Sequence, residues 1–190
     1  MEQGSESGGV IVVTEIKSYI SSTIVGIPAP FYWILLVVFG VGLITLVWSR
    51  GVREGLRFGA VLLLVEWVFV LLGIAVIFRE PGAERAFNLI PLSSYFQISE
   101  DSYLMEKAAI NILNVVLFFP VGLLLGLGFK NITWKRALAI IFGLSVMIEL
   151  LQLIFKCGLC EVDDVIHNVV GGAIGYLTIT ISAHKSAPWC

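Results

Sequence analysis

Four side chains that could carry acid–base chemistry lie in the last quarter of the chain: Glu149, Asp163, Asp164 and His167. Carboxyl and imidazole groups are common general acids and bases in enzymes. All four lie in or beside long apolar runs, where an ionisable side chain costs roughly 2.5–3.5 kcal/mol at the centre of a membrane helix. These residues are therefore candidate catalytic groups, and their presence needs a reason.

Polar side chains recur at helical spacing in three of the apolar runs, so each run presents one polar face. Small residues continue two of these faces and let a neighbouring helix approach closely. The faces consist of Ser145, Glu149, Gln152 and Lys156; of Asn111, Asn114, Gly122 and Gly126; and of Asp164, Asn168, Gly171 and Gly175. We expect one ligand-binding site, formed by Arg85, Asn88, Asn111, Asn114, Glu149, Gln152, Asp163, Asp164 and Asn168.

The composition is typical of an integral membrane protein. Of the 190 residues, 58% are hydrophobic and 14% are charged, whereas soluble domains carry about 25% charged residues. A net charge of −2 leaves no basic excess for a nucleic-acid partner. The three cysteines do not form the dense framework of a small secreted domain. No cofactor is expected.

Five runs are long and apolar enough to cross a bilayer, since a helix needs about 20 apolar residues to span the hydrocarbon. They are residues 31–48, 58–78, 108–129, 137–155 and 165–182. Lys and Arg concentrate in the first and third loops, which places these loops in the cytoplasm. We therefore expect an all-α, polytopic helical bundle in the cell membrane, with the N-terminus outside and the C-terminus in the cytoplasm.

The segments outside these runs are short. Residues 1–30 are expected to form a flexible tail and a helix over 10–27 that lies in the membrane interface, because Glu15 and Lys17 disfavour a crossing there. Residues 31–182 then form the transmembrane domain, and 183–190 form a short cytoplasmic tail. The loop around Asn88–Leu92 is expected to be irregular or re-entrant, because Pro91 lacks an amide proton.

The order of the polar motifs resembles the VanZ-like family, from Arg85 to Tyr176. This chain departs from the family pattern at Leu92, where the family usually has Phe, and at Cys157, where it often has Arg. If that Arg pairs with the closing acids, Lys156 or Arg85 must replace it. The motifs that carry the resemblance are Arg85-Ala-Phe-Asn88-Leu-Ile-Pro91, Asn111 with Asn114, Phe118-Phe-Pro120-Val-Gly122, Ser145-Val-Met-Ile-Glu149-Leu-Leu-Gln152 and Glu161-Val-Asp163-Asp164-Val-Ile-His167-Asn168-Val-Val-Gly171.

The resemblance implies a bacterial membrane protein, some relatives of which lower susceptibility to lipidated glycopeptide antibiotics such as teicoplanin. It supplies no reaction. We expect a protein that binds an anionic envelope lipid or a lipid-tailed antibiotic at the outer leaflet. The alternative is a membrane-embedded enzyme that acts on a lipid-linked phosphate or glycan, with Glu149 and Asp164 as acid and base and His167 as a helper. Proton-coupled transport through Glu66 and Glu149 is less favoured, because no inverted repeat is detectable.

Each acidic candidate also has a structural interpretation. Glu149 could be a protonated carboxyl that joins helices through hydrogen bonds to nearby amides. Asp163 and Asp164 suit a helix start, where carboxylates cap amides and meet the helix dipole. Glu66, alone in the second span, could pair with the asparagines of the third span or form part of a proton path.

The remaining metal-binding and redox signals are weak. His167 and Asp163 share a helical face, but zinc sites usually have more nitrogen or sulfur ligands than one His supplies. A hard divalent cation bound by oxygen atoms would fit these residues better. We predict no metal site. Cys157 and Cys160 have redox spacing, but without a surrounding βαβ pattern they are interpreted as incidental loop cysteines.

Overall fold

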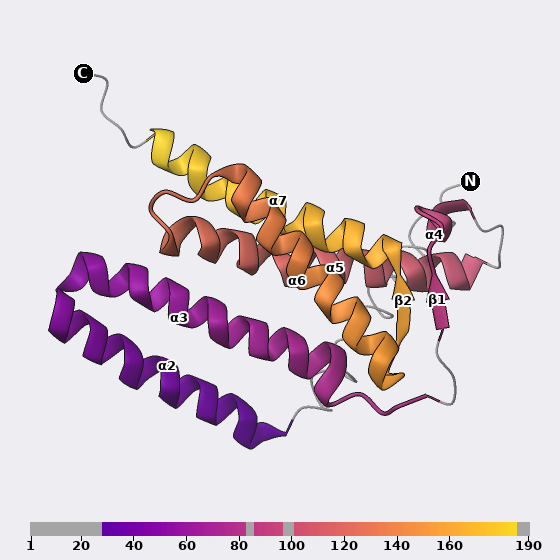
Figure 1. The fold of residues 1–190 in the computed structure, drawn as a ribbon, viewed down its shortest axis with the longest axis horizontal. Helices are drawn as coiled ribbons and strands as arrows, with labels where there is room; N and C mark the ends of the chain where they lie inside the picture. Colours follow the sequence, from indigo (N-terminus) through magenta and orange to yellow (C-terminus); the bar gives the residue numbers. More distant parts are fainter. Residues whose placement is uncertain (1–27, 83–85, 97–100, 186–190) are drawn as a thin grey trace, which may run out of the picture.

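The structure is a computed structural model that describes residues 28–82, 86–96 and 101–185. The predicted interfacial helix over 10–27 and the candidate Arg85 lie outside these residues. Along the chain the elements are α2 (Ala29–Arg50), α3 (Val52–Leu72), the π-helix η1 (Gly73–Ile77), β1 (Ala86–Asn88), α4 (Ser93–Phe96), α5 (Asp101–Gly128), α6 (Trp134–Phe155), β2 (Leu159–Glu161) and α7 (Val162–Lys185), as Figure 1 shows.

Five helical segments are long and apolar enough to cross a membrane. They are Ala29–Arg50, Glu54–Ile77, Lys107–Gly128, Trp134–Phe155 and Val162–Ile181. Each overlaps one of the five predicted runs, and the strands comprise only three residues each. The prediction of an all-α, multi-pass membrane bundle is therefore confirmed.

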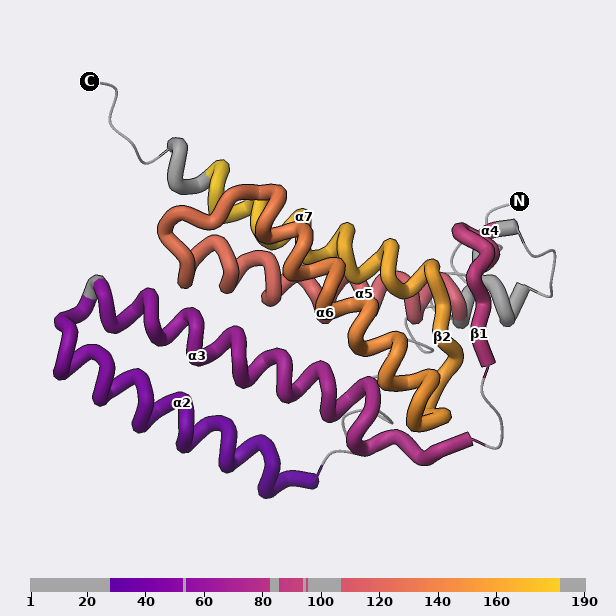
Figure 2. The backbone as a smooth tube through the Cα atoms, in the orientation of Figure 1, coloured from indigo at the N-terminus to yellow at the C-terminus, as the bar shows by residue number. Residues whose placement is uncertain are grey.

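The chain reverses direction at the end of each spanning helix, so α5 and α7 run the same way and α6 runs against them (Figure 2). The turns at Gly51 and at residues 129–133 lie at one end of the bundle. The short elements β1, α4 and β2 gather at the other end (Figure 1). We call this second end the β end. The helix α2 packs along α3, which in turn contacts α5.

The closest helix pair is α5 with α7, and glycines explain it. A Cβ added to Gly171 would collide with the carbonyl oxygen of Val115, and one added to Gly175 would collide with that of Phe119. A Cβ added to Gly122 of α5 would likewise collide with the carbonyl oxygen of Gly172. Small residues permit this backbone-to-backbone approach, as the sequence predicted for Gly122, Gly171 and Gly175.

A proline inside α5 coincides with a contact to α3. Pro120 has no amide hydrogen, so it cannot donate to the carbonyl of Val116 one turn earlier. Beside that position, Trp67 Nε1 donates to the carbonyl oxygen of Leu117 at 2.9 Å. This bond fixes α3 against α5 and so contributes to one wall of the cavity described below.

Two three-residue strands close the β end. They pair in parallel, with Ala86 opposite Leu159 and Asn88 opposite Glu161. The turn after β1 contains Leu92 in the left-handed region, with φ of 58°, and leads into α4. The irregular loop predicted at Asn88–Leu92 is confirmed, whereas the strand pairing was not predicted.

Candidate ligand-binding cavity

A cavity of about 230 Å³ lies among α3, η1, α5, α6, β2 and α7 at the β end. One part of its wall is apolar and the other is polar or charged. The apolar lining consists of Leu71, Ile74, Ala75, Ile110, Leu113, Leu117, Phe118, Ile148 and Leu159; the polar lining consists of Arg79, Lys107, Asn114, Glu149, Gln152, Glu161, Asp164 and Asn168.

Two of the predicted catalytic carboxyls, Glu149 and Asp164, line this cavity together. Glu149 is buried, and its Oε2 accepts a hydrogen bond of 3.0 Å from the backbone amide of Glu161. The amide belongs to the last residue of β2, immediately before α7 begins, so it brings the end of α6 to the start of α7. The Asp164 side chain makes no hydrogen bond to any other residue that the structure describes. The sequence therefore correctly predicted that these two acids lie close together.

Two cations that the sequence analysis did not single out line the cavity, whereas the predicted Arg85 lies outside the described residues. Lys107 Nζ lies 2.6 Å from Glu161 Oε2 in a largely buried ion pair. Arg79 also lines the cavity, and its Nη1 donates to the carbonyl oxygen of Cys157 at 3.4 Å. Lys156, proposed to replace the missing family Arg, caps α6 in the left-handed conformation and does not line the cavity. The helical stripe of α6 thus ends one residue too early to include Lys156.

Three amide side chains that line the cavity have atoms without a hydrogen-bond partner among the described residues. These atoms are Asn114 Nδ2, Gln152 Oε1 and Asn168 Oδ1. The other ends of two side chains are held: Gln152 Nε2 donates to the carbonyl oxygen of Ala75 at 3.3 Å, and Asn168 Nδ2 donates to Ser145 Oγ at 2.9 Å. Since a buried polar atom without a partner is costly, these three atoms are available to water or to a ligand.

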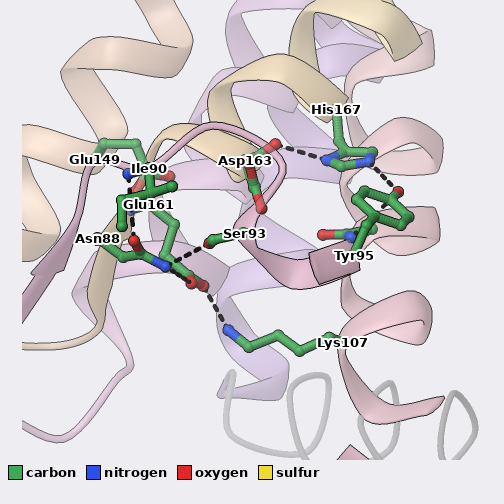
Figure 3. Close-up of polar contacts among 10 residues, drawn as sticks. Asn88, Ile90, Ser93, Tyr95, Lys107, Glu149, Glu161, Asp163 and His167 are labelled. Carbon is green, nitrogen blue, oxygen red and sulfur yellow. Dashed lines mark hydrogen bonds and ion pairs between the residues drawn. The ribbon is translucent and has the colours of Figure 1, made fainter. Parts of the chain in front are cut away.

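The loop from β1 to α4 contacts the acidic residues before and at the start of α7, as the dashed lines at Asn88 and Glu161 in Figure 3 show. Asn88 Nδ2 donates to Ser93 Oγ at 2.6 Å and to Glu161 Oε1 at 3.5 Å. The backbone amide of Leu92 donates to Asp163 Oδ1. Asn88 and Asp163 therefore support the loop and do not line the cavity.

His167 and Asn111 belong to the same supporting network. His167 Nδ1 lies 2.6 Å from the carbonyl oxygen of Asp163, and its Nε2 lies 2.8 Å from the Tyr95 hydroxyl. Because a carbonyl only accepts, Nδ1 carries the proton, and in the neutral ring Nε2 accepts from Tyr95. Asn111 Nδ2 reaches the same hydroxyl at 3.4 Å. Both nitrogens of His167 are thus engaged, and the described residues contain no group of three His, Cys, Asp or Glu side chains placed to hold a metal ion.

The predicted site residues therefore separate into two sets. Asn114, Glu149, Gln152, Asp164 and Asn168 line the cavity, whereas Asn88, Asn111, Asp163 and His167 hold the loop beside it. Sequence reasoning missed Arg79, Lys107 and Glu161 as lining residues. Lys107 lies directly before the third apolar run and Glu161 lies two residues before Asp163, so their positions were a weak indication that they belong to the site. Arg79 offered none.

The two described cysteines also lie at this end. Cys157 is buried, and its thiol lies 3.8 Å from the carbonyl oxygen of Ala75. Burial, with smaller contributions from the Glu149 and Asp164 carboxylates, raises the pKa of the Cys160 thiol above its usual value. A raised pKa reduces the thiolate fraction near neutral pH, which lowers the reactivity of this thiol.

Glu66 lies elsewhere. It is buried and lines a separate groove of about 260 Å³ with residues of α2 and α3, including Tyr32, Phe39 and Trp67. Its Oε1 has no hydrogen-bond partner among the described residues. Of the two interpretations offered from the sequence, hydrogen bonds to the third-span asparagines are thus not formed.

Comparison with known proteins places these features in a family. The VanZ/LLP1 family model matches residues 31–183. Over 92 residues, or 48% of the chain, the sequence is 36% identical to Protein VanZ of Enterococcus faecium. This alignment covers 51% of that protein, so the chain spans about half the length of the curated relative that it matches. No solved structure matches the chain.

Proposed function

The chain belongs to the VanZ/LLP1 family, and from this premise we propose that it binds the polar head of an amphipathic envelope ligand in the cavity at the β end. The ligand is an envelope lipid or a lipid-tailed antibiotic, and its binding lowers susceptibility to lipidated glycopeptides. The observation that carries the proposal is that charged and apolar side chains share one cavity within membrane-spanning helices.

The volume of the cavity supports a head group as its occupant. Sites for whole drug-sized ligands usually enclose about 300–1,000 Å³, which is more than the 230 Å³ present here. A larger ligand would therefore place only part of itself inside. The apolar side chains of Ile74, Leu113 and Leu117 give the start of an acyl tail an apolar surface beside the head group.

The distribution of basic residues supports an outward-facing cavity. Arg50 and Arg57 flank the first turn, and Lys130, Lys135 and Arg136 flank the turn between α5 and α6. These turns lie at the end of the bundle opposite the cavity (Figure 2). Because basic loops are retained in the cytoplasm, we place the β end at the outer leaflet, with the N-terminus outside and the C-terminus inside.

The two buried carboxyls provide a direct test. Glu149→Gln replaces a carboxyl group of the cavity wall by an amide, and Glu66→Gln makes the same exchange in the separate groove. We expect a susceptible bacterium that expresses Glu149→Gln to lose protection against a lipidated glycopeptide, while Glu66→Gln protects like the parent chain at equal membrane abundance. Unchanged protection by Glu149→Gln would contradict the proposal. Loss in both variants would favour a proton path instead.

An enzyme remains the second candidate, because Glu149 and Asp164 face one cavity and could act as acid and base. The substrate would be a lipid-linked phosphate or glycan. Purified protein would then convert a polyprenyl-linked substrate, in a metal-dependent reaction, and Asp164→Asn would abolish turnover. Ligand binding without turnover by the parent chain would exclude this candidate.

A further inference from the structure

Charged and amide side chains line the cavity together. Lys107 in α5 and Asp164 in α7 lie near the β end, where each helix enters the cavity. Asn114 lies about two turns beyond Lys107, and Asn168 lies about one turn beyond Asp164, because a helix has ~3.6 residues per turn. In α6, which runs towards the β end, Gln152 lies about one turn nearer that end than Glu149, so a head group in the cavity meets charged groups and amides together.

The three amide side chains of the cavity offer two hydrogen-bond acceptors and one donor. Gln152 and Asn168 are only 7% and 4% exposed, and each has a side-chain oxygen without a partner among the described residues. The orientation of Gln152 follows from its neighbour, since only its nitrogen can donate to the carbonyl of Ala75. Asn114 presents a donor, because its Nδ2 has no acceptor among the described residues.

An ionised phosphate meets only part of this requirement. It could accept from Asn114, but it has no proton for the oxygens of Gln152 and Asn168, and it would face the carboxyl groups of Glu149 and Asp164. The two cations among the described lining residues already have partners, since Lys107 contacts Glu161 at 2.6 Å and Arg79 Nη1 donates to the carbonyl oxygen of Cys157 at 3.4 Å. A bound cation could bridge a phosphate to the acids, but the described residues contain no group of three His, Cys, Asp or Glu side chains placed to hold one.

An ammonium group fails in the opposite way. Its three hydrogens could meet the oxygens of Gln152 and Asn168, but it offers no acceptor to Asn114. A hydroxyl both donates and accepts, so several hydroxyls on one rigid ring can meet all three amides and the two carboxyls. Ligand hydroxyls that reproduce the hydrogen bonds of ordered water can replace that water without loss of binding affinity.

We propose that the head group bound in this cavity is polyhydroxylated and sugar-like, attached to an apolar tail. This inference rests on the proposed function and names its ligand class. The cavity of about 230 Å³ corresponds to about seven or eight waters at ~30 Å³ each. A cavity of this volume suits a single sugar ring, and further sugars would extend out of it.

Three probes with the same tail test the inference: octyl β-glucoside, octyl phosphate and octylammonium. The full chain is held in phospholipid nanodiscs free of sugar detergents, and each probe is titrated below its micelle concentration by calorimetry. We expect the glucoside to bind at least about tenfold more tightly than either charged probe, which corresponds to ~1.4 kcal/mol. Tighter binding of octyl phosphate or octylammonium would overturn the inference and leave the proposed function intact. Binding of none would contradict both.

Substitutions at Asn114 show whether the glucoside occupies the cavity. Asn114→Leu removes the unpartnered donor and should weaken glucoside binding about tenfold or more. Asn114→Asp should retain binding within about threefold, because a hydroxyl can donate to the new oxygen. Asn131→Leu, in the exposed turn after α5, makes the matched exchange away from the cavity and should change nothing. Equal binding by the parent chain and Asn114→Leu would mean partition into the disc and would overturn the inference.

Discussion

The α5–α7 pair and the α2–α3 hairpin are both membrane-spanning, yet they are built differently. In α5–α7, three glycines bring the backbones into contact over about two helical turns, from Val115 to Gly122 of α5. In α2–α3, close backbone approach is found beside the turn, where an added Cβ at Gly55 would meet the backbone of Val47. Farther from the turn, an added Cβ at Gly42 or Gly59 would meet only the end of a leucine side chain. Backbone contact fixes the position of neighbouring helices more strictly than flexible side chains do. The cavity lies beside the rigid pair, and this rigidity suits a binding site.

The buried carboxyls of the two regions differ in the same way. Glu149 is bound by a backbone amide and shares its cavity with several charged and amide groups. Glu66 lies in a groove whose other lining residues are Tyr32, Trp67 and aliphatic or aromatic side chains. A network of polar groups at one end of the bundle indicates ligand binding, whereas one isolated carboxyl carries no comparable signal.

The largest expected effect concerns the glycines. Gly171→Ala or Gly175→Ala forces the α5 and α7 backbones apart, and overpacking of this kind typically costs about 1–3 kcal/mol. Gly42→Ala should cost less than about 0.5 kcal/mol, because the Leu62 side chain can move. Thermal denaturation in detergent micelles measures the difference. Equal destabilisation of the two regions would break the comparison.

An intermediate effect is expected for the ion pairs. The Lys107–Glu161 pair is 14% and 8% exposed at its two side chains, whereas the Arg57–Glu54 pair of the hairpin is 33% and 51% exposed. Glu161→Gln leaves a largely buried ammonium without its carboxylate and should cost about 2 kcal/mol. Glu54→Gln should cost less than about 1 kcal/mol, because surface pairs contribute little. A loss at Glu54 as large as that at Glu161 would contradict this account.

The smallest effect is expected at two tyrosines. Tyr95→Phe removes the hydroxyl that contacts His167 and Asn111, and loss of such a bond costs about 0.5–1.5 kcal/mol. Only the loop before α5 should open more often, so hydrogen exchange should rise in residues 89–96 and not in the helices. Tyr32→Phe, in the hairpin groove, is the matched control and should leave exchange unchanged. Unaltered exchange in Tyr95→Phe would show that the network does not hold the loop.

Much of the fold could be predicted because its signals are local. Each spanning helix is a run of apolar residues whose length reports the crossing directly. The glycine contacts between α5 and α7 follow from helical spacing, since residues one turn apart share a face. The proximity of Glu149 to Asp164 follows from this spacing together with the alternating direction of the spans, which brings the end of α6 to the start of α7. Five of the nine predicted ligand-binding residues line the cavity for this reason.

The features that were missed depend on segments far apart in the chain. β1 and β2 are three residues each and are about 70 residues apart, so neither has a periodicity that could be recognised. Arg79 follows a π-helix, and no helical pattern from α3 relates it to the acids of α6 and α7. His167 looked like a catalytic or metal-binding group because its partners, Tyr95 and the Asp163 carbonyl, were unknown.

Site-specific photocrosslinking in native membranes tests most directly whether the cavity receives an amphipathic ligand. A photoreactive side chain at Leu113 would face the cavity, and one at Val116, on the exposed face of the same helix, would face lipid. We predict that position 113 captures a distinct amphiphile, identified by mass spectrometry and lost in Glu149→Gln, while position 116 captures bulk phospholipid. Identical adducts at both positions would contradict the account.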